Sequence, residues 1–101
     1  MAAQSTALVT GAGIGIGRAT ALAFARAGYH VVVTDILEAE GRAACESILA
    51  AGGSAEFATM DVRSTARVDE VVARVVAERG ALDALVLNAG IAHKVPLAQL
   101  D

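Results

Sequence analysis

The chain has 101 residues, 55% of them apolar and 19% charged, which is enough for one packed domain and too apolar for an intrinsically disordered segment. Its formal charge is −3, with Lys94 as the single lysine, and this argues against a protein that reads a nucleic-acid backbone. The lone Cys45 cannot form an internal disulfide. The N-terminus lacks the basic start of a signal peptide and no apolar run approaches the roughly 18 residues of a membrane span, so we expect a cytoplasmic protein.

The hydrophobic pattern alternates along the chain between short apolar runs, typical of strands, and longer stretches with helical spacing. The first two apolar runs have no polar face, and we expect them to be strands buried on both sides. A glycine follows each expected helix, as is typical of helix ends. In chain order the sequence predicts a strand at 7–10, a helix at 17–27, a strand at 30–35, a helix at 37–51 and a strand at 55–60. These are followed by a helix from 65 to 79, a strand at 82–87 and the first turn of another helix at 96–101.

The third helix is predicted from the helical spacing of its apolar residues, although these residues have a low helix propensity. Val68, Val71, Val72, Val75 and Val76 follow the i, i+3, i+4, i+7, i+8 spacing of one helical face, although valine is a poor helix former. Ser64 is the expected N-cap of this helix and Gly80 its expected stop. His30 is interpreted as a strand-edge residue.

Strands that alternate with helices of this length require right-handed crossovers, so we expect a single α/β domain over residues 1–101. Its parallel sheet would be covered by helices on both sides. No linker, repeat or low-complexity segment interrupts the pattern.

Four glycines stand where the first strand turns into the first helix. They are Gly11, Gly13, Gly15 and Gly17. Without Cβ atoms the backbone can turn tightly and approach a pyrophosphate, whose charge is met by the N–H groups and dipole of the following helix. The alternative is a glycine-rich turn that binds nothing.

The spacing of this loop does not fit G-x-G-x-x-G and does fit T-G-x-x-x-G-x-G, starting at Thr10. The chain here resembles the short-chain dehydrogenase/reductase family, and the resemblance extends to Asp61-Val62 after the third strand and to 88–90, Asn-Ala-Gly, after the fourth. Leu87 departs from the family, which often has another Asn there. The resemblance implies a Rossmann-type, doubly wound parallel sheet, incomplete, with four strands in the order 3-2-1-4. It also implies an oxidoreductase that transfers hydride between NAD(P) and an alcohol/carbonyl pair.

Asp35 ends the second strand, where a carboxylate can accept hydrogen bonds from the ribose hydroxyls of an adenosine. A 2′-phosphate would be repelled by this carboxylate, so the sequence favours NAD over NADP. The positions where a basic residue could compensate hold Ala12, Gly13, Ile14 and Ile36, and Arg18 is interpreted as the nearest cation. Asp35 could alternatively be a turn residue or a helix N-cap.

The resemblance further implies that Asp61 accepts a hydrogen bond from the adenine amino group and that Val62 packs beside the ring. Residues 88–91 would line the adenosine ribose and help to hold the central strand. Each of these could instead be an ordinary residue of a turn at a strand end. No metal ligand and no catalytic residue is predicted. The predicted cofactor-binding residues are Gly11, Gly13, Ile14, Gly15, Ile16, Gly17, Asp35, Ile36, Asp61, Val62, Asn88, Ala89, Gly90 and Ile91.

The catalytic residues that the resemblance implies, a Ser and a Tyr-x-x-x-Lys pattern, are not in this sequence. Tyr29 is the one tyrosine, and no lysine follows it at the required place. We therefore expect a cofactor-binding part that is truncated before the catalytic segment. The alternatives are a non-catalytic nucleotide-binding half-domain that needs a second polypeptide, or an S-adenosylmethionine-dependent methyltransferase, which is disfavoured because Thr10 stands where those enzymes usually have an acidic residue. The fourth strand would leave an open sheet edge, from which we expect self-association.

Overall fold

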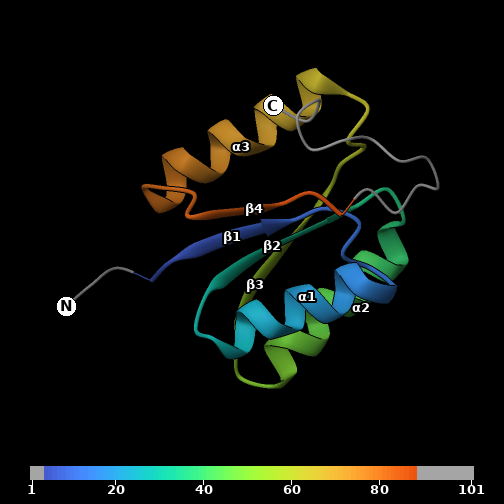
Figure 1. The fold of residues 1–101 in the computed structure, drawn as a ribbon, viewed down its shortest axis with the longest axis vertical. Coiled ribbons are helices and arrows are strands. Elements are labelled where there is room, and N and C mark those ends of the chain that lie inside the picture. The colour runs from blue at the N-terminus through green and yellow to red at the C-terminus, as the bar shows by residue number, and fades with distance from the viewer. Residues whose placement is uncertain (1–3, 89–101) are drawn as a thin grey trace.

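A computed structural model describes residues 4–88, in which strands and helices alternate along the chain (Figure 1). Ala89, Gly90, Ile91 and the helical turn expected at 96–101 lie outside these residues. The elements are β1 (Thr6–Val9), α1 (Gly15–Arg26), β2 (His30–Asp35), α2 (Glu38–Ala50), β3 (Ser54–Thr59), α3 (Thr65–Arg79) and β4 (Ala84–Val86).

The four strands form one parallel sheet in the order β3-β2-β1-β4, which confirms the predicted fold class. Val9 of β1 lies opposite Val33 of β2 on one side and opposite Val86 of β4 on the other. Helices α1 and α2 cover one face of the sheet and α3 covers the opposite face (Figure 1). The loops that follow the strands therefore meet at one edge of the sheet, where doubly wound folds bind ligands.

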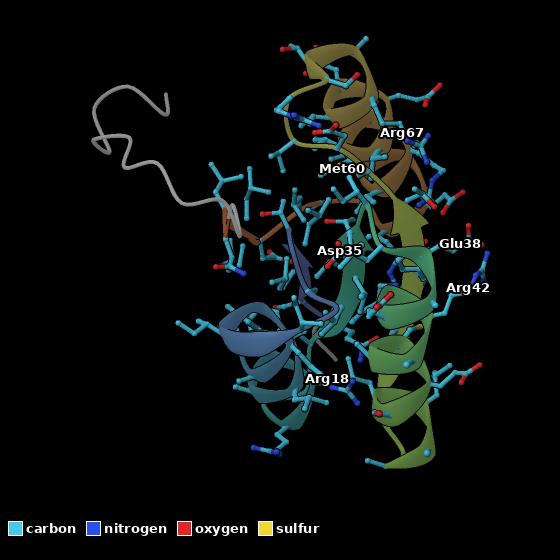
Figure 2. All side chains as sticks on the ribbon, turned by 90° about the vertical axis from the view of Figure 1, so that its right-hand side faces the viewer. Arg18, Asp35, Glu38, Arg42, Met60 and Arg67 are labelled. Atoms are coloured by element: carbon cyan, nitrogen blue, oxygen red, sulfur yellow. The ribbon has the colours of Figure 1, made fainter. Side chains whose placement is uncertain are left out.

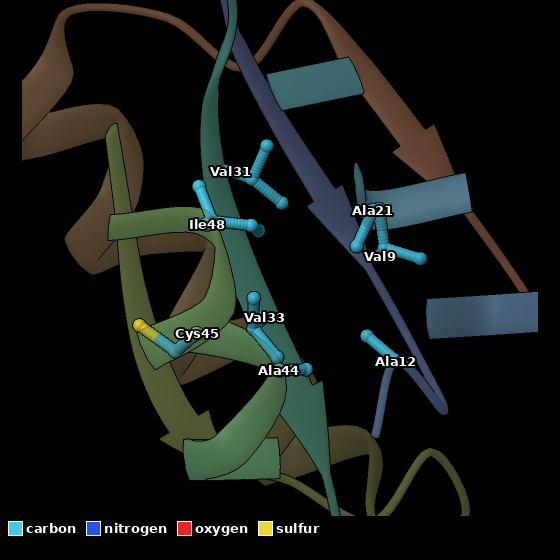
Figure 3. Close-up of a cluster of buried hydrophobic side chains, with 8 residues drawn as sticks. All are labelled: Val9, Ala12, Ala21, Val31, Val33, Ala44, Cys45 and Ile48. Atoms are coloured by element: carbon cyan, nitrogen blue, oxygen red, sulfur yellow. The ribbon is translucent and has the colours of Figure 1, made fainter. Parts of the chain in front are cut away.

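The alternation of side chains along the buried strands divides the core into two layers. Val9, Val31 and Val33 point toward α1 and α2, where they pack with Ala21, Ala44 and Ile48 (Figure 3). Leu8 and Val32 point the other way and pack with Val71 and Val75 of α3. Every residue of β1 and β2 is buried, as expected for parallel strands without a polar side. The two layers together cover both faces of these strands.

The ends of α3 are those predicted from the sequence. The Ser64 hydroxyl accepts a hydrogen bond from the Arg67 backbone N–H, and Gly80 ends the helix with a φ of 90°. Val76 departs from the expected apolar face, since it is 41% exposed whereas Val71 and Val75 are buried. Helix α3 covers the sheet along a stripe narrower than the valine pattern suggests.

Of the other elements, β2 has its predicted bounds, β1, α2 and β3 differ from theirs by one residue at each end, and α1 and β4 differ by more. Helix α1 begins at Gly15, two residues before the predicted start, so the last two glycines of the loop belong to its first turn. Strand β4 is three residues long, against a prediction of 82–87, and Asp83 before it contacts the backbone of Thr6 through both its backbone N–H and its carboxylate. Cys45 is a core residue, and burial raises the pKa of its thiol.

His30 lies at the edge of its strand, as interpreted, although that strand is a central one of the sheet. It begins β2, which lies between β1 and β3, and the side chain is buried. Its Nε2 lies 2.8 Å from Glu56 Oε2 and its Nδ1 2.6 Å from Ser54 Oγ. Glu56 also accepts a hydrogen bond from Arg74 of α3 at 2.9 Å. A polar cluster thus joins two strands and a helix at the end of the sheet opposite to the glycine loop.

Candidate functional site

The glycine loop, the end of β2, the turn after β3 and the turn after β4 lie together at the carboxyl edge of the sheet. Ala12 N–H donates to the Thr34 carbonyl at 3.0 Å, which lays the glycine loop along the end of β2. The Thr10 hydroxyl donates to the Asn88 carbonyl at 3.1 Å, and the Asn88 amide donates to the Gly11 carbonyl at 3.2 Å. These two bonds fasten the loop to the end of β4.

Two of the four glycines are required by the packing of the chain against itself. A Cβ on Gly17 would lie 2.0 Å from the Gly11 carbonyl oxygen, and one on Gly11 would lie 2.5 Å from the Asn88 carbonyl oxygen. No side chain can occupy such contacts. Gly11 and Gly17 thus allow α1 to start directly against the loop.

Gly15 differs, because a Cβ there would meet no atom within 4 Å although its φ is +58°. It begins α1, whose N-cap Ile14 has no side-chain hydrogen bond and whose first turn has no acidic residue. The first backbone hydrogen bond of the helix is donated by Arg18 to Ile14, so among residues 4–88 the amides of Gly15, Ile16 and Gly17 have no acceptor. Open space beside unpaired amides at a positive helix end fits a phosphate group.

Asp35 is held in place by backbone groups on both sides. Its Oδ2 accepts a hydrogen bond from Gly13 N–H at 2.8 Å and its Oδ1 one from Leu37 N–H at 2.9 Å, and the residue is only 6% exposed. A Cβ on Gly13 would lie 2.9 Å from Oδ2. Because Gly13 has no side chain, its backbone N–H can approach the Asp35 carboxylate closely enough to form this hydrogen bond.

A pocket of about 190 Å³ opens between the ends of β2 and β3. Ile36, which is 56% exposed, and Val62 give it apolar surface. It brings together five of the predicted residues, from the glycine loop, the end of β2 and the turn after β3, and it adds two that were not predicted, Met60 and Arg63. The lining residues are Gly11, Asp35, Ile36, Met60, Asp61, Val62 and Arg63.

Arg63 lines this pocket and was not predicted from the sequence. Its Nη2 donates to Asp61 Oδ2 at 2.8 Å and its Nε to Asp61 Oδ1 at 3.1 Å. These side-chain hydrogen bonds, and then the one from the Arg63 backbone N–H, lower the pKa of Asp61 below its ordinary value. The spacing of an Asp two residues before an Arg, directly after a strand, was the available signal, because an Asp in a turn often accepts from the backbone two residues on.

Arg18, expected to be the cation nearest to Asp35, is directed elsewhere. Its Nη2 donates to the Ser47 hydroxyl at 2.8 Å, which joins α1 to α2. Figure 2 shows Arg18 between these helices and Asp35 at the end of β2. Arg63 is the cation that shares the pocket with Asp35.

Ile14 and Ile16 lie exposed beside the glycine loop, at 56% and 79%. Asn88 closes the same edge of the sheet, whereas Ala89, Gly90 and Ile91 lie outside the described residues. Between residues 4 and 88, no three His, Cys, Asp or Glu side chains are grouped to hold a metal ion. In the same part of the chain, no helix has the length and apolar character to cross a membrane.

The sequence profile of the short chain dehydrogenase family matches residues 5–101. The chain is 49% identical over 83 residues to the probable oxidoreductase EphD of Mycobacterium tuberculosis, covering 82% of this chain and 14% of that protein. It is 43% identical over 100 residues to the cis-4-hydroxycyclohexanecarboxylate dehydrogenase of Sinomonas cyclohexanicum, covering 98% of this chain and 40% of that one.

Solved structures show the same likeness. A metagenomic short-chain oxidoreductase in complex with NADP superposes with a TM-score of 0.84 at 35% identity, covering 98% of this chain and 45% of that one. The hydroxysteroid dehydrogenase of Escherichia coli superposes with a TM-score of 0.77 at 32% identity, covering 82% and 35%. In every one of these matches the chain spans less than half of the other protein.

Proposed function

The chain belongs to the short-chain dehydrogenase family, whose members bind NAD(P), and on this premise we propose that it is the NAD-binding part of an oxidoreductase that acts on an alcohol/carbonyl pair. The observation that carries the proposal is the start of α1. The amides of Gly15, Ile16 and Gly17 are unpaired there among residues 4–88, and a Cβ on Gly15 would meet no atom within 4 Å, on the same sheet edge as Asp35 and the pocket after β3. A dinucleotide needs these three features in a row, for its pyrophosphate, ribose and adenine.

The cofactor would be held by the residues predicted from the sequence. The amides of Gly15, Ile16 and Gly17 would bind the pyrophosphate, with Ile14 and Ile16 presenting apolar surface beside it. Asp35 would accept from the adenosine ribose, because each of its oxygens has a further lone pair beside the backbone donor it already binds.

The adenine would enter the pocket between Ile36 and Val62, next to Asp61. Residues 88–91 would line the adenosine ribose and help to hold the central strand. When bound, NAD supplies a hydride acceptor or donor, and the residues of this chain bind and orient it.

The preference for NAD rests on charge. Asp35 places an anion where an NADP 2′-phosphate would lie, and its two backbone donors fix the carboxylate in that position. Arg63 shares the pocket, but its guanidinium is engaged with Asp61. A 2′-phosphate would therefore meet a fixed anion at Asp35, and the charge of Arg63 is partly offset by Asp61.

Calorimetric titration of the chain with NADH, NADPH and S-adenosylmethionine tests the proposal. We expect NADH to bind most tightly. Tighter binding of NADPH would contradict the argument from Asp35. Binding of S-adenosylmethionine alone, or of none of the three, would refute the assignment of a dinucleotide site.

A pair of variants at Gly15 separates loss of binding from loss of folding. Asp and Asn both tolerate a positive φ and have the same shape, and open space at this position accepts either. Gly15→Asp places a negative charge at the expected pyrophosphate, where we expect at least about tenfold weaker NADH binding than for Gly15→Asn. The same charge stabilises the start of α1, so a weaker affinity could not be attributed to unfolding.

We also propose that the open edge of β4 mediates self-association. Within residues 4–88 this strand pairs with β1 alone, and Leu85 and Leu87 are 47% and 46% exposed. An unpaired edge with exposed leucines favours pairing with a second copy. Light scattering of the chain and of Leu85→Lys tests this, and a monodisperse monomer before substitution would refute it.

A further inference from the structure

Arg63 contacts Asp61 through both its backbone and its side chain. Oδ1 of Asp61 accepts from the Arg63 backbone N–H at 2.9 Å and from Nε at 3.1 Å. Oδ2 accepts from Nη2 at 2.8 Å, while its contact with Nε is longer, at 3.3 Å. The turn is closed by the Ser64 backbone N–H, which donates to the Asp61 carbonyl at 2.9 Å. The carboxylate is thereby fixed against the start of α3.

This arrangement decides which atom of Asp61 can accept a further hydrogen bond. A carboxylate oxygen accepts about two hydrogen bonds, and both positions on Oδ1 are taken. Oδ2 has one short bond, and the 3.3 Å contact lies beyond the usual N–H···O range. Arg63 therefore leaves Asp61 with one strong acceptor position, on Oδ2.

The guanidinium of Arg63 supplies donors directly beside that acceptor. It has five N–H groups, of which Nε and one on Nη2 are directed at Asp61. Its side chain is 75% exposed, and both residues line the pocket after β3. The polar end of the pocket is thus an acceptor, Oδ2, flanked by a cationic donor.

A 6-aminopurine matches this pair. Its exocyclic amine is a donor and the neighbouring ring nitrogen an acceptor, whereas a 6-oxopurine places an acceptor oxygen where the amine would be. A carboxylate fixed at Oδ2 binds the amine and repels the oxygen. At about 190 Å³ the pocket is smaller than the roughly 300–1,000 Å³ of a site for a whole drug-sized ligand, which suits one planar base.

Building on the proposed function, we propose that Arg63 is a positioning residue that holds Asp61 so that the pocket selects a 6-aminopurine over a 6-oxopurine. Arg63 acts through Asp61, and its two-point contact, rather than its charge alone, sets the orientation. Lysine keeps the charge but offers only a point contact.

The test is calorimetric titration of the 101-residue chain with NAD and with nicotinamide hypoxanthine dinucleotide, in which an oxo group replaces the 6-amine of the purine and N1 carries a proton. We expect the unsubstituted chain to favour NAD on the order of tenfold, the worth of one charge-assisted hydrogen bond. Arg63→Ala and Arg63→Lys should both reduce this ratio to about threefold or less. Arg79→Ala is the matched control, since it removes the same charge at the far end of α3, where Arg79 bonds Gln4, and it should leave the ratio unchanged.

Each outcome decides the matter. An unchanged ratio in Arg63→Ala would overturn the role of Arg63 while leaving the dinucleotide site intact. A ratio retained by Arg63→Lys would overturn the fixed orientation in favour of charge alone. A chain that binds neither dinucleotide would overturn both the proposed function and the role of Arg63. The ratio, unlike either affinity, is insensitive to a general loss of folded protein.

Discussion

Replacement of Gly17 by alanine should destabilise the protein far more than an ordinary substitution in the first turn of a helix. A Cβ at this position would lie 2.0 Å from the Gly11 carbonyl oxygen and 2.4 Å from Asn88 Nδ2. An unstrained carbon-to-oxygen contact is about 3.3 Å. The start of α1 and the loop would therefore have to separate by roughly 1.3 Å, and because the nearest atom is backbone, no rotamer change can relieve the contact.

The magnitude follows from three contributions. Overpacking of this kind costs about 1–3 kcal/mol, and a clash with backbone belongs at the upper end. Separation of the loop also breaks the hydrogen bond from Asn88 to Gly11, worth about 1 kcal/mol. The better helix propensity of alanine returns about 1 kcal/mol. The net loss is about 3 kcal/mol, a large part of a typical domain stability of about 5–15 kcal/mol.

Urea denaturation of Gly17→Ala and Gly15→Ala measures this difference. Gly15→Ala makes the same chemical change two residues earlier with no atom in reach, so its cost is the roughly 1–2 kcal/mol of a positive φ. We expect the urea midpoint of Gly17→Ala to be lower than that of Gly15→Ala. In a thermal melt, the Tm of Gly17→Ala should lie more than about 10 °C below that of the unsubstituted chain. Equal midpoints, or a more stable Gly17→Ala, would refute the argument that the loop and α1 are in contact here.

Three further substitutions have expected outcomes. Asp35→Ala leaves the buried Gly13 N–H and the partly exposed Leu37 N–H without their acceptor and should lower the free energy of unfolding by about 1–3 kcal/mol in urea titration, while calorimetry should find NADPH binding strengthened relative to NADH. Burial tends to raise the pKa of Glu56, yet the hydrogen bonds it accepts bring its pKa below the ordinary value. Its contribution is therefore present above about pH 4.3 and is lost as the pH falls further, so Glu56→Gln should weaken the acid dependence of stability measured by urea titration at several pH values. Gly41→Ala would bring a Cβ within 2.0 Å of the Phe57 ring, and thermal melts should find it destabilised by about 1–3 kcal/mol.

The fold could be predicted because its signals are local and mutually consistent. The apolar runs at β1 and β2 have no polar face, and Ser64 and Gly80 bound α3 by their own backbone chemistry. The exposure of Val76 could not be predicted, since the width of the buried stripe depends on how α3 lies across the sheet. Helical period defines a face but not the area of that face which the sheet covers.

The site was predicted less completely, because its contacts join residues far apart in the sequence. The glycine spacing indicates a phosphate loop, but it cannot show that Gly13 lies against Asp35, twenty-two residues on. Arg63 was missed because cations were sought only in the glycine loop and at the end of β2. The turn after β3 reaches the same pocket through the order of the strands.

The four glycines of one motif perform different tasks, and this limits what the motif proves. Gly11 and Gly17 allow the chain to pack against itself, and Gly13 makes room for the Asp35 carboxylate. Gly15 is the one at which the backbone conformation calls for glycine while the space beside it stays open. The fold would need Gly11, Gly13 and Gly17 even in a protein that binds nothing. Among the four glycines of the motif, Gly15 is therefore the one that indicates a ligand.

Asp35 connects these two roles. The carboxylate proposed to bind the ribose is also the acceptor that holds Gly13 and Leu37. A substitution that removes its charge to admit a 2′-phosphate would also release the glycine loop from the end of β2. The proposed cofactor preference is thus a property of the folded loop as much as of one side chain, and a change of preference at Asp35 that keeps the loop in place requires a replacement that still accepts the Gly13 N–H.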